Sequence, residues 1–432
     1  MAVVVVGGGL AGLAASRRLR AAGVASIVLE ADDAPGGRVR TDVVDGFVLD
    51  RGFQLYNPAY PEGARVLDHD ALDLRAFIAG AVVVLPGRSK GTDLGGRREI
   101  RLADPRRQPR WALSAATAPI GSPVSTARFG AYALSRGLRS PAALRGEPDI
   151  TAYEALRRAG ADRTLIERVL RPFLSGVFLE SELTTSRRFL DLVLRSFLRG
   201  TPAVPARGMR AIPEQLAVGT DLRLGVTVAD VGPRHVVTAD GERIDADAVI
   251  VAADPRSAAR LVPGLTVPAG RAVTTWYHRP DCAPEELVRG EAVLVLDGAR
   301  RGPLVNTTVM SHAAPGYAPA GSSLVSSSAL GVRDTAAHER AVRDHLSWLY
   351  GVDASRWELI ARYAIPYALP AMPVPLDIRK RVTMHNGLIV AGDHRDTSSI
   401  QGALVSGRRA ADAALEQMGV PRPREPRPLE AS

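Results

Sequence analysis

The sequence predicts an α/β protein that combines a Rossmann-like domain, discontinuous in the chain, with an inserted α+β domain. Three observations lead to this prediction. The chain opens with a strand, a helix and a second strand; strand patterns return after residue 220; and a strand, a glycine turn and a helix come near the C-terminus. Between these regions the spacing of apolar residues changes to that of helices and irregular segments.

The composition indicates a globular chain with two or three structural units. The chain has 432 residues, of which 46% are hydrophobic and 23% charged, and a domain usually has roughly 150 residues. Cys282 is the only cysteine, which excludes an intramolecular disulfide and cysteine-based metal or redox centres. We therefore expect no metal site and a reducing compartment.

The charge balance raises the question of an anionic partner. The formal net charge is +9, and nearly all basic residues are arginine, because Lys90 and Lys380 are the only lysines. The arginines are scattered and are not interleaved with aromatic residues, as they are in proteins that stack bases. We predict a solvated basic surface and no nucleic-acid partner.

The apolar N-terminus lacks the pattern of a signal peptide. No basic residue precedes it, and four glycines interrupt it, so we expect a cytoplasmic protein. No stretch of about 18 uncharged apolar residues occurs elsewhere. A further hypothesis is peripheral membrane contact through residues 111–138, which are apolar, small and basic; a surface segment over a substrate tunnel is the alternative.

The first thirty residues form a mononucleotide-binding unit in this interpretation. Residues 3–6 are a β-branched run typical of a buried parallel strand, residues 10–22 follow as a helix closed by Gly23, and residues 26–29 form a second strand that ends at Glu30. Strand, helix and strand within about thirty residues are typical of such a unit.

The turn between the first strand and the helix has the pattern G-x-G-x-x-G. Gly7 permits a tight turn, Gly9 lets the backbone approach a pyrophosphate, and Gly12 allows close packing of helix and strand. The helix N-terminus, at Leu10 and Ala11, favours the negative charge. Glu30 lies eighteen residues after Gly12, where a carboxylate accepts hydrogen bonds from ribose hydroxyls. These residues predict a dinucleotide site.

A second signature follows the acid at Gly36, Gly37 and Arg38, with Val39 and Arg40 after them. It resembles the second motif of the FAD-dependent amine oxidase, phytoene desaturase and protoporphyrinogen oxidase superfamily. The resemblance implies an FAD-binding domain in which Arg38 and the glycine backbone contact the FAD diphosphate. A guanidinium suits this position, because it offers phosphate a forked pair of donors.

The resemblance continues in the middle of the chain. Residues 207–209 are similar to the Gly-Gly-Met segment of the superfamily, although Arg207 replaces the usual first glycine. Residues 224–228 resemble a strand whose valine, here Val228, holds the adenine through main-chain hydrogen bonds. Residues 249–253 resemble the strand before the second crossover.

The C-terminal motif carries the strongest part of the resemblance. It consists of residues 391–393, 399–403 and 406–407. It implies that Asp393 binds the ribityl chain and that a helix N-terminus, at Gly402 and Ala403, faces the pyrimidine of the flavin. We expect the strand at 387–390 and the helix at 403–418. His394 adjoins Asp393 and either approaches the cofactor or, as the favoured interpretation, is an exposed loop residue. The cofactor residues implied here are Gly392, Asp393, Ile400, Gln401, Gly402 and Ala403.

The remaining segments are assigned to a substrate domain and a tail. We expect helices in part of 71–200, one of them starting at Thr151, and short strands with a helix at 336–350 in 271–380. The predicted boundaries are 1–70, 201–270 and 381–419 for the FAD-binding domain, 71–200 and 271–380 for the substrate domain, and 420–432 for a disordered tail.

The substrate site is less specific in the sequence. Residues 171–177 and 184–188 either line a substrate tunnel or belong to the core. Residues 363–370 resemble the segment beside the flavin in amine oxidases, but their tyrosines also suit a structural role. Neither lysine is assigned beside the flavin, and no catalytic residue is assigned.

The resemblance implies an FAD-dependent oxidoreductase that transfers a hydride from a small or apolar organic substrate, an amine or an isoprenoid or carotenoid-like compound, to the flavin. The electron acceptor is oxygen, a quinone or another compound. The apolar middle of the chain favours the desaturase-like branch. Serine hydrolase, zinc protease and P-loop motifs are absent from the sequence.

Two rival hypotheses remain. One is a non-catalytic binding protein like the Rab GDP-dissociation inhibitors, which share this fold and hold prenylated or apolar partners; the intact nucleotide motifs argue against it. The other is an NAD-dependent dehydrogenase, in which the C-terminal motif would have no role.

Overall fold

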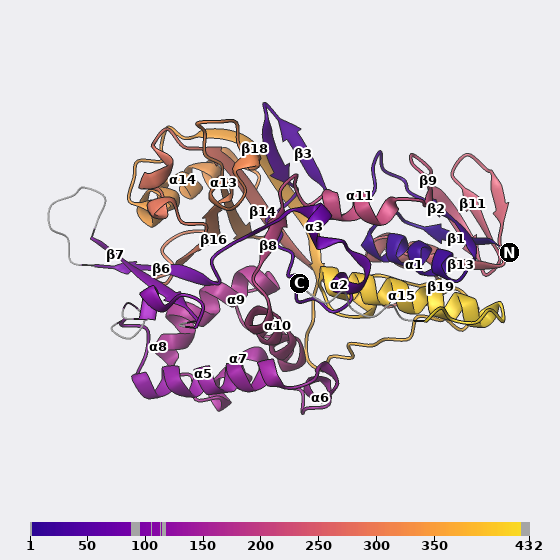
Figure 1. Cartoon of the computed structure of the whole chain (residues 1–432), viewed down its shortest axis with the longest axis horizontal. Coiled ribbons are helices and arrows are strands. Elements are labelled where there is room, and N and C mark those ends of the chain that lie inside the picture. The colour runs from indigo at the N-terminus through magenta and orange to yellow at the C-terminus, as the bar shows by residue number, and fades with distance from the viewer. Residues whose placement is uncertain (1, 88–95, 105, 113, 115–117, 425–432) are drawn as a thin grey trace.

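The computed structural model describes residues 2–87, 96–104, 106–112, 114 and 118–424. Lys90 and residues 425–432 of the predicted tail lie outside these ranges. In Figure 1 the Rossmann-like part lies at the right and the inserted part at the left.

The first sheet has five strands, all parallel. Its central strand is a run of valines buried on both faces, as expected for a parallel sheet with helices or sheets against both sides. In spatial order the strands are β19 (Ile389–Val390), β13 (Ala248–Val251), β1 (Ala2–Val6), β2 (Ala25–Leu29) and β9 (Asp221–Arg223).

Different layers cover the two faces of this sheet. Helices α1 (Leu10–Ala21) and α15 (Ile400–Gln417) share one buried cluster with the sheet. They approach closely because Gly407 has no side chain: a Cβ there would lie 2.1 Å from the carbonyl oxygen of Ala11. The other face packs against α12 (Pro255–Leu261) and a three-stranded antiparallel sheet. That sheet contains β10 (Val228–Gly232), β11 (His235–Thr238) and β12 (Arg243–Asp245).

The second large sheet has seven strands and carries the inserted part. Helix α14 (Ala336–Tyr350) packs on it through Val342 and Leu346, in one cluster with Trp276. In spatial order the strands are β18 (Glu358–Pro370), β14 (Gly270–Arg279), β17 (Val325–Leu330), β16 (Leu304–Val309), β15 (Leu294–Asp297), β6 (Gly80–Pro86) and β7 (Arg97–Ala103).

A group of helices lies below this sheet in Figure 1. Several of them begin at a serine, threonine or aspartate whose side chain accepts a hydrogen bond from the first turn, and Thr151 is one of these caps, as predicted. The group contains α5 (Pro123–Leu138), α6 (Pro141–Arg145), α7 (Ala152–Arg158), α8 (Arg163–Leu165), a π-helical segment (Ile166–Leu170), α9 (Arg171–Phe178) and α10 (Arg187–Arg199).

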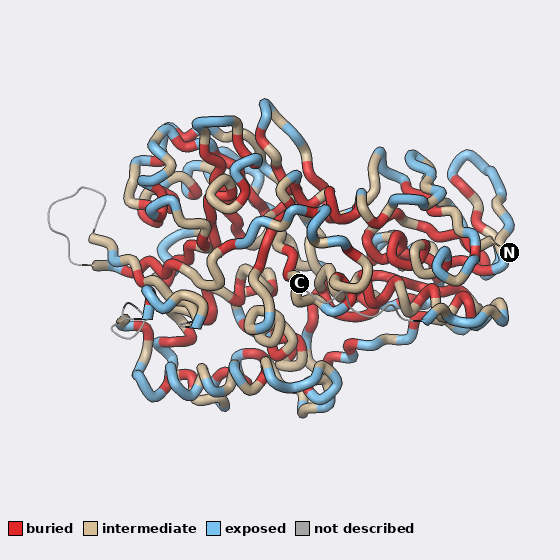
Figure 2. Tube along the Cα trace, viewed as in Figure 1, coloured by how far each residue is buried: buried red, intermediate tan, exposed pale blue. Residues whose placement is uncertain are grey.

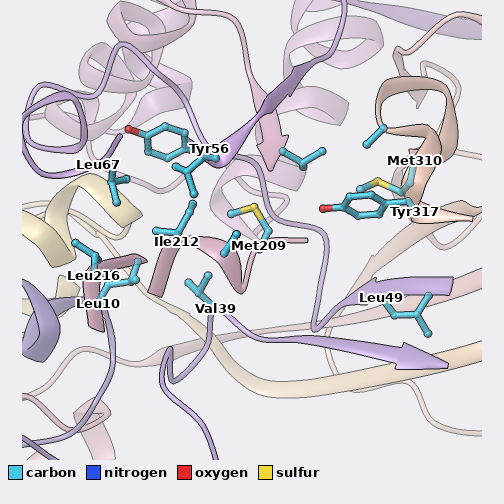
Figure 3. Close-up of a cluster of buried hydrophobic side chains, with 14 of the residues drawn as sticks. Leu10, Val39, Leu49, Tyr56, Leu67, Met209, Ile212, Leu216, Met310 and Tyr317 are labelled. Carbon is cyan, nitrogen blue, oxygen red and sulfur yellow. The ribbon is translucent and has the colours of Figure 1, made fainter. Parts of the chain in front are cut away.

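Short elements connect the two parts. They enclose a buried cluster that contains Leu10, Val39, Met209 and Tyr317 (Figure 3). Figure 2 shows long buried stretches here and in the parallel sheet, whereas the lower helices mix buried, partly exposed and exposed residues. The connecting elements are β3 (Thr41–Val44), β4 (Phe47–Asp50), α2 (Gly63–Val66), α3 (His69–Leu72), β5 (Leu74–Ala76), β8 (Ala203–Pro205), α11 (Ala211–Ala217) and α13 (Met310–Ala313).

Asp50 holds this junction together. Its carboxylate accepts hydrogen bonds from the hydroxyls of Thr41 (2.6 Å) and Tyr317 (2.9 Å) and from the amide of Met209 (2.8 Å). Complete burial raises the pKa of Asp50 to about 6 despite these three donors. No local sequence pattern indicates this network, because Met209 and Tyr317 are far from Asp50 in the chain.

Several predicted elements differ from the structure. Residues 224–227 are not a strand, since β9 ends at Arg223 and β10 begins at Val228. The strand predicted at 387–390 is reduced to β19, and the last helix begins at Ile400 rather than Ala403 because Ser399 caps it.

Strands in the inserted part were also underestimated. The hairpin of β6 and β7 was not predicted, although β6 is a run of small and β-branched residues. The region 271–380 contains long strands, of 10 residues in β14 and 13 in β18, rather than short ones only. The five parallel strands do come from the three segments assigned to the FAD-binding domain; the domain boundaries themselves stay a prediction.

A candidate cofactor and substrate cavity

The glycine turn between β1 and α1 is shaped by backbone geometry. Gly7 has a φ of 108°, and a Cβ there would lie 2.7 Å from the carbonyl oxygen of Ala252, so only glycine fits. A Cβ on Gly12 would lie 2.0 Å from the carbonyl oxygen of Gly7. Gly12 therefore permits the close packing of α1 on the turn that its spacing predicted.

The first turn of α1 is open toward the cavity. Gly9 is its N-cap and offers no side-chain acceptor, so the N–H groups of Leu10 and Ala11 have no intrahelical partner. A Cβ on Gly9 would meet no atom within 4 Å. Backbone donors beside open space fit the diphosphate of a dinucleotide.

Glu30 lies at the end of β2 and lines the same cavity. Its Oε2 accepts a hydrogen bond from the amide of Gly8 (2.6 Å), and its Oε1 accepts one from the amide of Asp32 (2.9 Å). These bonds fix the carboxylate while each oxygen keeps a lone pair for another donor. The arrangement fits recognition of ribose hydroxyls.

The second signature lies directly against the first. The amide of Gly36 donates to the carbonyl oxygen of Gly8 at 2.9 Å, and Gly36 has a φ of 122°. A Cβ on Gly37 would lie 3.6 Å from the Cα of Gly9. The two glycine segments thus form one continuous backbone surface.

Arg38 links this surface to the C-terminal motif. Its Nη2 is 2.7 Å from Oδ1 of Asp393, and its Nη1 donates to the carbonyl oxygen of Ala368 at 2.8 Å. The Arg38 side chain is 33% exposed and that of Asp393 only 5%. Both residues line the cavity, so the guanidinium is held in place with one side open to a ligand.

The C-terminal motif supplies a helix N-terminus, but two residues before the predicted position. The Oγ of Ser399 accepts from the amide of Gly402 (3.0 Å), and the amide of Ala403 donates to the carbonyl oxygen of Ser399. The N–H groups without an intrahelical partner are therefore those of Ile400 and Gln401. The amides of Gly402 and Ala403, where the helix N-terminus was expected, both donate to Ser399; the role of these residues at the cofactor stays a prediction.

Most of the predicted cofactor residues line one cavity. Its volume is about 1710 Å³, above the roughly 300–1,000 Å³ of ordinary ligand sites. Two predicted residues do not line it: Gly12 packs against Gly7, and Gly402 packs against Thr397. The predicted residues along its wall are Gly7, Gly9, Leu10, Ala11, Glu30, Gly36, Gly37, Arg38, Val228, Gly392, Asp393, Ile400, Gln401 and Ala403.

The cavity continues from the nucleotide region into the inserted part, where its wall is apolar. Phe129 of α5, Phe173 of α9 and Phe197 of α10 line this section. The rings of Phe173 and Phe197 pack edge to face with centroids 5.3 Å apart. Helix α10 contributes an almost continuous stretch of the wall, residues 192–198.

The structure divides the segment 171–177 between the two alternatives, cavity wall and core. Phe173, Gly176 and Val177 line the cavity, whereas Leu174 is buried in a helical core. Residues 184–188 do not line it. Helix α10 was missed, although its dense apolar pattern was a signal that one face of this helix meets something other than water.

The segment 363–370 forms the last eight residues of β18 and contributes to the cavity through Ile365, Ala368 and Leu369. Its tyrosine hydroxyls bond elsewhere: that of Tyr363 donates to Asp42 (2.8 Å) and that of Tyr367 to the carbonyl oxygen of Pro268 (2.9 Å). These hydrogen bonds favour a structural role for Tyr363 and Tyr367 over a role beside the flavin.

The position of His394 differs from the favoured prediction. It was predicted to be exposed but is 1% exposed and lines the cavity. Its ring packs on Gly392, and within the described chain neither ring nitrogen has a hydrogen-bond partner. Burial lowers the pKa of His394 to about 4, so the ring is neutral at pH 7. The sequence could not reveal this, because the turn at Gly392 folds the ring inward.

A family model for flavin containing amine oxidoreductases matches residues 10–415 of the chain. The chain belongs to this family. The predicted enzyme class, an FAD-dependent oxidoreductase, and the predicted FAD cofactor are those of the family. The free donors of α1, the open space at Gly9 and the carboxylate of Glu30 fit such a cofactor.

Individual relatives are more distant. Coproporphyrinogen III oxidase of Propionibacterium freudenreichii subsp. freudenreichii is 25% identical over 338 residues, which make up 63% of this chain and 60% of that protein. Putrescine oxidase of Kocuria rosea is 46% identical over 71 residues, 16% of this chain and 15% of that protein. The matches therefore span less than two thirds of either relative.

Solved structures agree on the fold. The structure of an oxidoreductase from Methanosarcina mazei superposes with a TM-score of 0.73 at 17% identity and covers 95% of this chain and 100% of that one. A protoporphyrinogen oxidase-like protein from Exiguobacterium sp. 255-15 gives a TM-score of 0.67 at 19% identity, covering 96% and 99%. Within the described chain, no helix is both long and apolar enough to cross a membrane.

Proposed function

We propose that this family member oxidises an extended, apolar organic substrate by transfer of a hydride to FAD. FAD, when bound, supplies the hydride acceptor. The chain's own residues would hold it as follows: the first turn of α1 and Arg38 at the diphosphate, Glu30 at the ribose, Val228 at the adenine, Asp393 at the ribityl chain, and the N–H groups of Ile400 and Gln401 at the pyrimidine.

The observation that carries the proposal is the apolar half of the cavity. Phe129, Phe173 and Phe197 lie on three different helices and line one space. The same cavity is lined by Gly392, Asp393 and Ile400 of the C-terminal motif. An apolar ligand gains free energy there roughly in proportion to the area it buries.

Three acids of the cavity wall argue against a polyamine substrate because each is paired with an arginine, and a fourth, Asp396, lies 3.6 Å from Arg409. Glu62 is paired with Arg408 (2.8 Å), Asp104 with Arg106 (2.5 Å), and Asp393 with Arg38 (2.7 Å). A diammonium ligand would have to break such pairs or leave its charges unpaired in an apolar space, which is costly. This favours the isoprenoid or carotenoid-like class over amines.

The N-terminus of α15 adds an electrostatic contribution. The unpaired N–H groups of Ile400 and Gln401 carry the positive end of the helix dipole. They would stabilise negative charge on a group beside them by about 0.3–1 kcal/mol. This is the sign required for accepting a hydride.

A spectroscopic experiment tests the proposal. The purified protein should absorb at flavin wavelengths, and anaerobic addition of isoprenoids should bleach this absorption, whereas diamines such as putrescine should not. Bleaching by diamines alone would overturn the apolar substrate. Bleaching by porphyrinogens but not isoprenoids would remove the desaturase-like branch, and a protein that neither contains nor binds FAD would overturn the enzyme itself.

Peripheral membrane contact is a second part of the proposal. Helix α5 turns Phe129 toward the cavity and exposes Val124 (60%), Leu134 (46%) and Leu138 (85%) on its outer side. An apolar substrate could enter here from a lipid surface. We expect the protein to float with anionic liposomes and Leu138→Glu to reduce flotation. Absence of flotation of the wild type would overturn the membrane contact. Either result is compatible with the predicted cytoplasmic location.

A further inference from the structure

One end of the cavity contains two arginines, Arg145 and Arg379, whose charges both act on Asp396, an acid that Arg409 also approaches. Arg145, at the end of α6, and Arg379, in the loop before β19, both line the cavity. Among the described residues, neither side chain takes part in a hydrogen bond or an ion pair. Arg379 is exposed and Arg145 half-buried, so the cavity reaches the molecular surface at this point.

These two arginines belong to a larger group of cations. Burial and then the charge of Arg379 lower the pKa of Arg145. Burial and then the charge of Arg409 lower the pKa of Arg395, and burial and then the charge of Arg395 lower the pKa of Lys380. Like charges held this closely repel one another, and an anion between them would relieve the repulsion.

The acids in this region do not neutralise the group. Asp377 uses one carboxylate oxygen to accept from the amide of Arg379. Asp396 lies 3.6 Å from Arg409 and is 6% exposed. Two carboxylates therefore face five cations: Arg145, Arg379, Lys380, Arg395 and Arg409.

Unpartnered polar atoms lie beside the arginines. Oδ2 of Asp396 and Oγ of Ser398 have no hydrogen-bond partner within the described chain, and both residues are 6% exposed and line the cavity. Buried polar atoms are nearly always paired in folded proteins. The Ser398 hydroxyl can donate to an anionic ligand, whereas Oδ2 of Asp396, 3.6 Å from Nη1 of Arg409, only accepts when ionised and balances part of the cationic charge.

The loop that carries Arg379 is held in place. The amide of Leu376 donates to Asp149 at 2.6 Å, and the carbonyl oxygen of Leu376 accepts from Arg188 at 2.9 Å. Asp149 also accepts from the hydroxyl of Ser186, the N-cap of α10. The charged end of the cavity is thereby fixed to the helix that forms much of its apolar wall.

We propose that Arg145 and Arg379 bind the anionic end, a carboxylate or a phosphate, of an amphipathic substrate whose apolar part lies along α5 and α10. The inference rests on the proposed function and narrows its substrate class from apolar to apolar with one charged end. Guanidinium groups suit both anions because each offers a forked pair of donors.

Binding of simple amphiphiles to the FAD-loaded protein tests the inference. Calorimetry should give a Kd for dodecanoate or dodecyl phosphate roughly tenfold to a hundredfold lower than for dodecanol, as expected for hydrogen bonds to charged groups. Arg145→Gln with Arg379→Gln should abolish this difference and leave dodecanol unchanged. Arg340→Gln, at an exposed position of α14 away from the cavity, should leave all three constants unchanged.

The outcomes separate the inference from the proposed function. If the wild type bound dodecanol and both anions with equal affinity, the anion site at Arg145 and Arg379 would be overturned, but the apolar substrate would not. The same holds if the double variant still bound the anions more tightly than dodecanol. Tight binding of one anion and not the other supports the inference and identifies the headgroup. A protein that holds FAD but binds none of the three compounds would overturn the apolar substrate of the proposed function as well.

Discussion

The two halves of the cavity are built by different means. At the nucleotide end, Gly7, Gly9, Gly36 and Gly37 bring main-chain atoms to the wall, beside the charged side chains of Glu30, Arg38 and Asp393. At the substrate end, aromatic and aliphatic side chains from separate helices form the wall. The first half tolerates little change in residue type, whereas the second is defined by volume and polarity and can vary.

The Arg38–Asp393 pair gives the largest expected effect, because it joins the two ends of the chain at the nucleotide half. Arg38→Leu leaves the buried carboxylate of Asp393 unpaired, which should lower the free energy of unfolding by about 3 kcal/mol and reduce FAD content. Urea unfolding and flavin absorbance measure both. Arg38→Leu with Asp393→Asn should recover part of the stability; if it does not, the loss is not due to an unpaired charge.

Two glycines separate packing from ligand binding within the nucleotide half. Gly12→Ala places a Cβ 2.0 Å from the carbonyl oxygen of Gly7 and should cost about 2–3 kcal/mol of stability. Gly9→Ala meets no protein atom within 4 Å, so the stability of the FAD-free protein should change by less than about 0.5 kcal/mol. The same Cβ points into the space for the diphosphate and should weaken FAD binding roughly tenfold. If Gly12→Ala and Gly9→Ala lowered the stability of the FAD-free protein by the same amount, the assignment of Gly12 to packing and of Gly9 to ligand binding would be contradicted.

His394 lies between the two halves and should make stability depend on pH. Its pKa falls from 6.5 to about 4 on burial, so between these values the unfolded chain binds more protons than the folded one. Stability should therefore fall as the pH drops below 6.5, by about 2 kcal/mol at pH 5. His394→Gln should remove this part of the acid sensitivity in urea titrations at pH 7 and pH 5. The exposed His385→Gln is the control; the same response from both variants would refute the assignment.

A change of volume in the substrate half should affect turnover without affecting the nucleotide half. Ala133 of α5 lines the cavity, whereas Ala131 of the same helix is exposed. Ala133→Trp should lower kcat/KM for a long apolar substrate about tenfold, or about 1.4 kcal/mol, without changing FAD content. Ala131→Trp should change neither quantity. Loss of FAD in Ala133→Trp would mean that the two halves are not independent.

The nucleotide half was largely predictable because its signals are local. Gly7, Gly9, Gly12 and Glu30 follow one another at a spacing that a strand, a tight turn and a helix require, and the structure has all three elements there. The start of α15 was misjudged because Ser399, a capping residue, was read as part of the loop before the helix.

The sequence by itself determined the α/β class, the parallel strands with their glycine turn, and the family, since these depend on residue spacing along short stretches. Only the tertiary structure decided that Arg38 meets Asp393, that His394 is buried, and that α10 lines the cavity next to Arg145 and Arg379. The physical reason is that these contacts join residues from distant parts of the chain. Their geometry depends on how whole helices and sheets pack, and no local pattern encodes that packing.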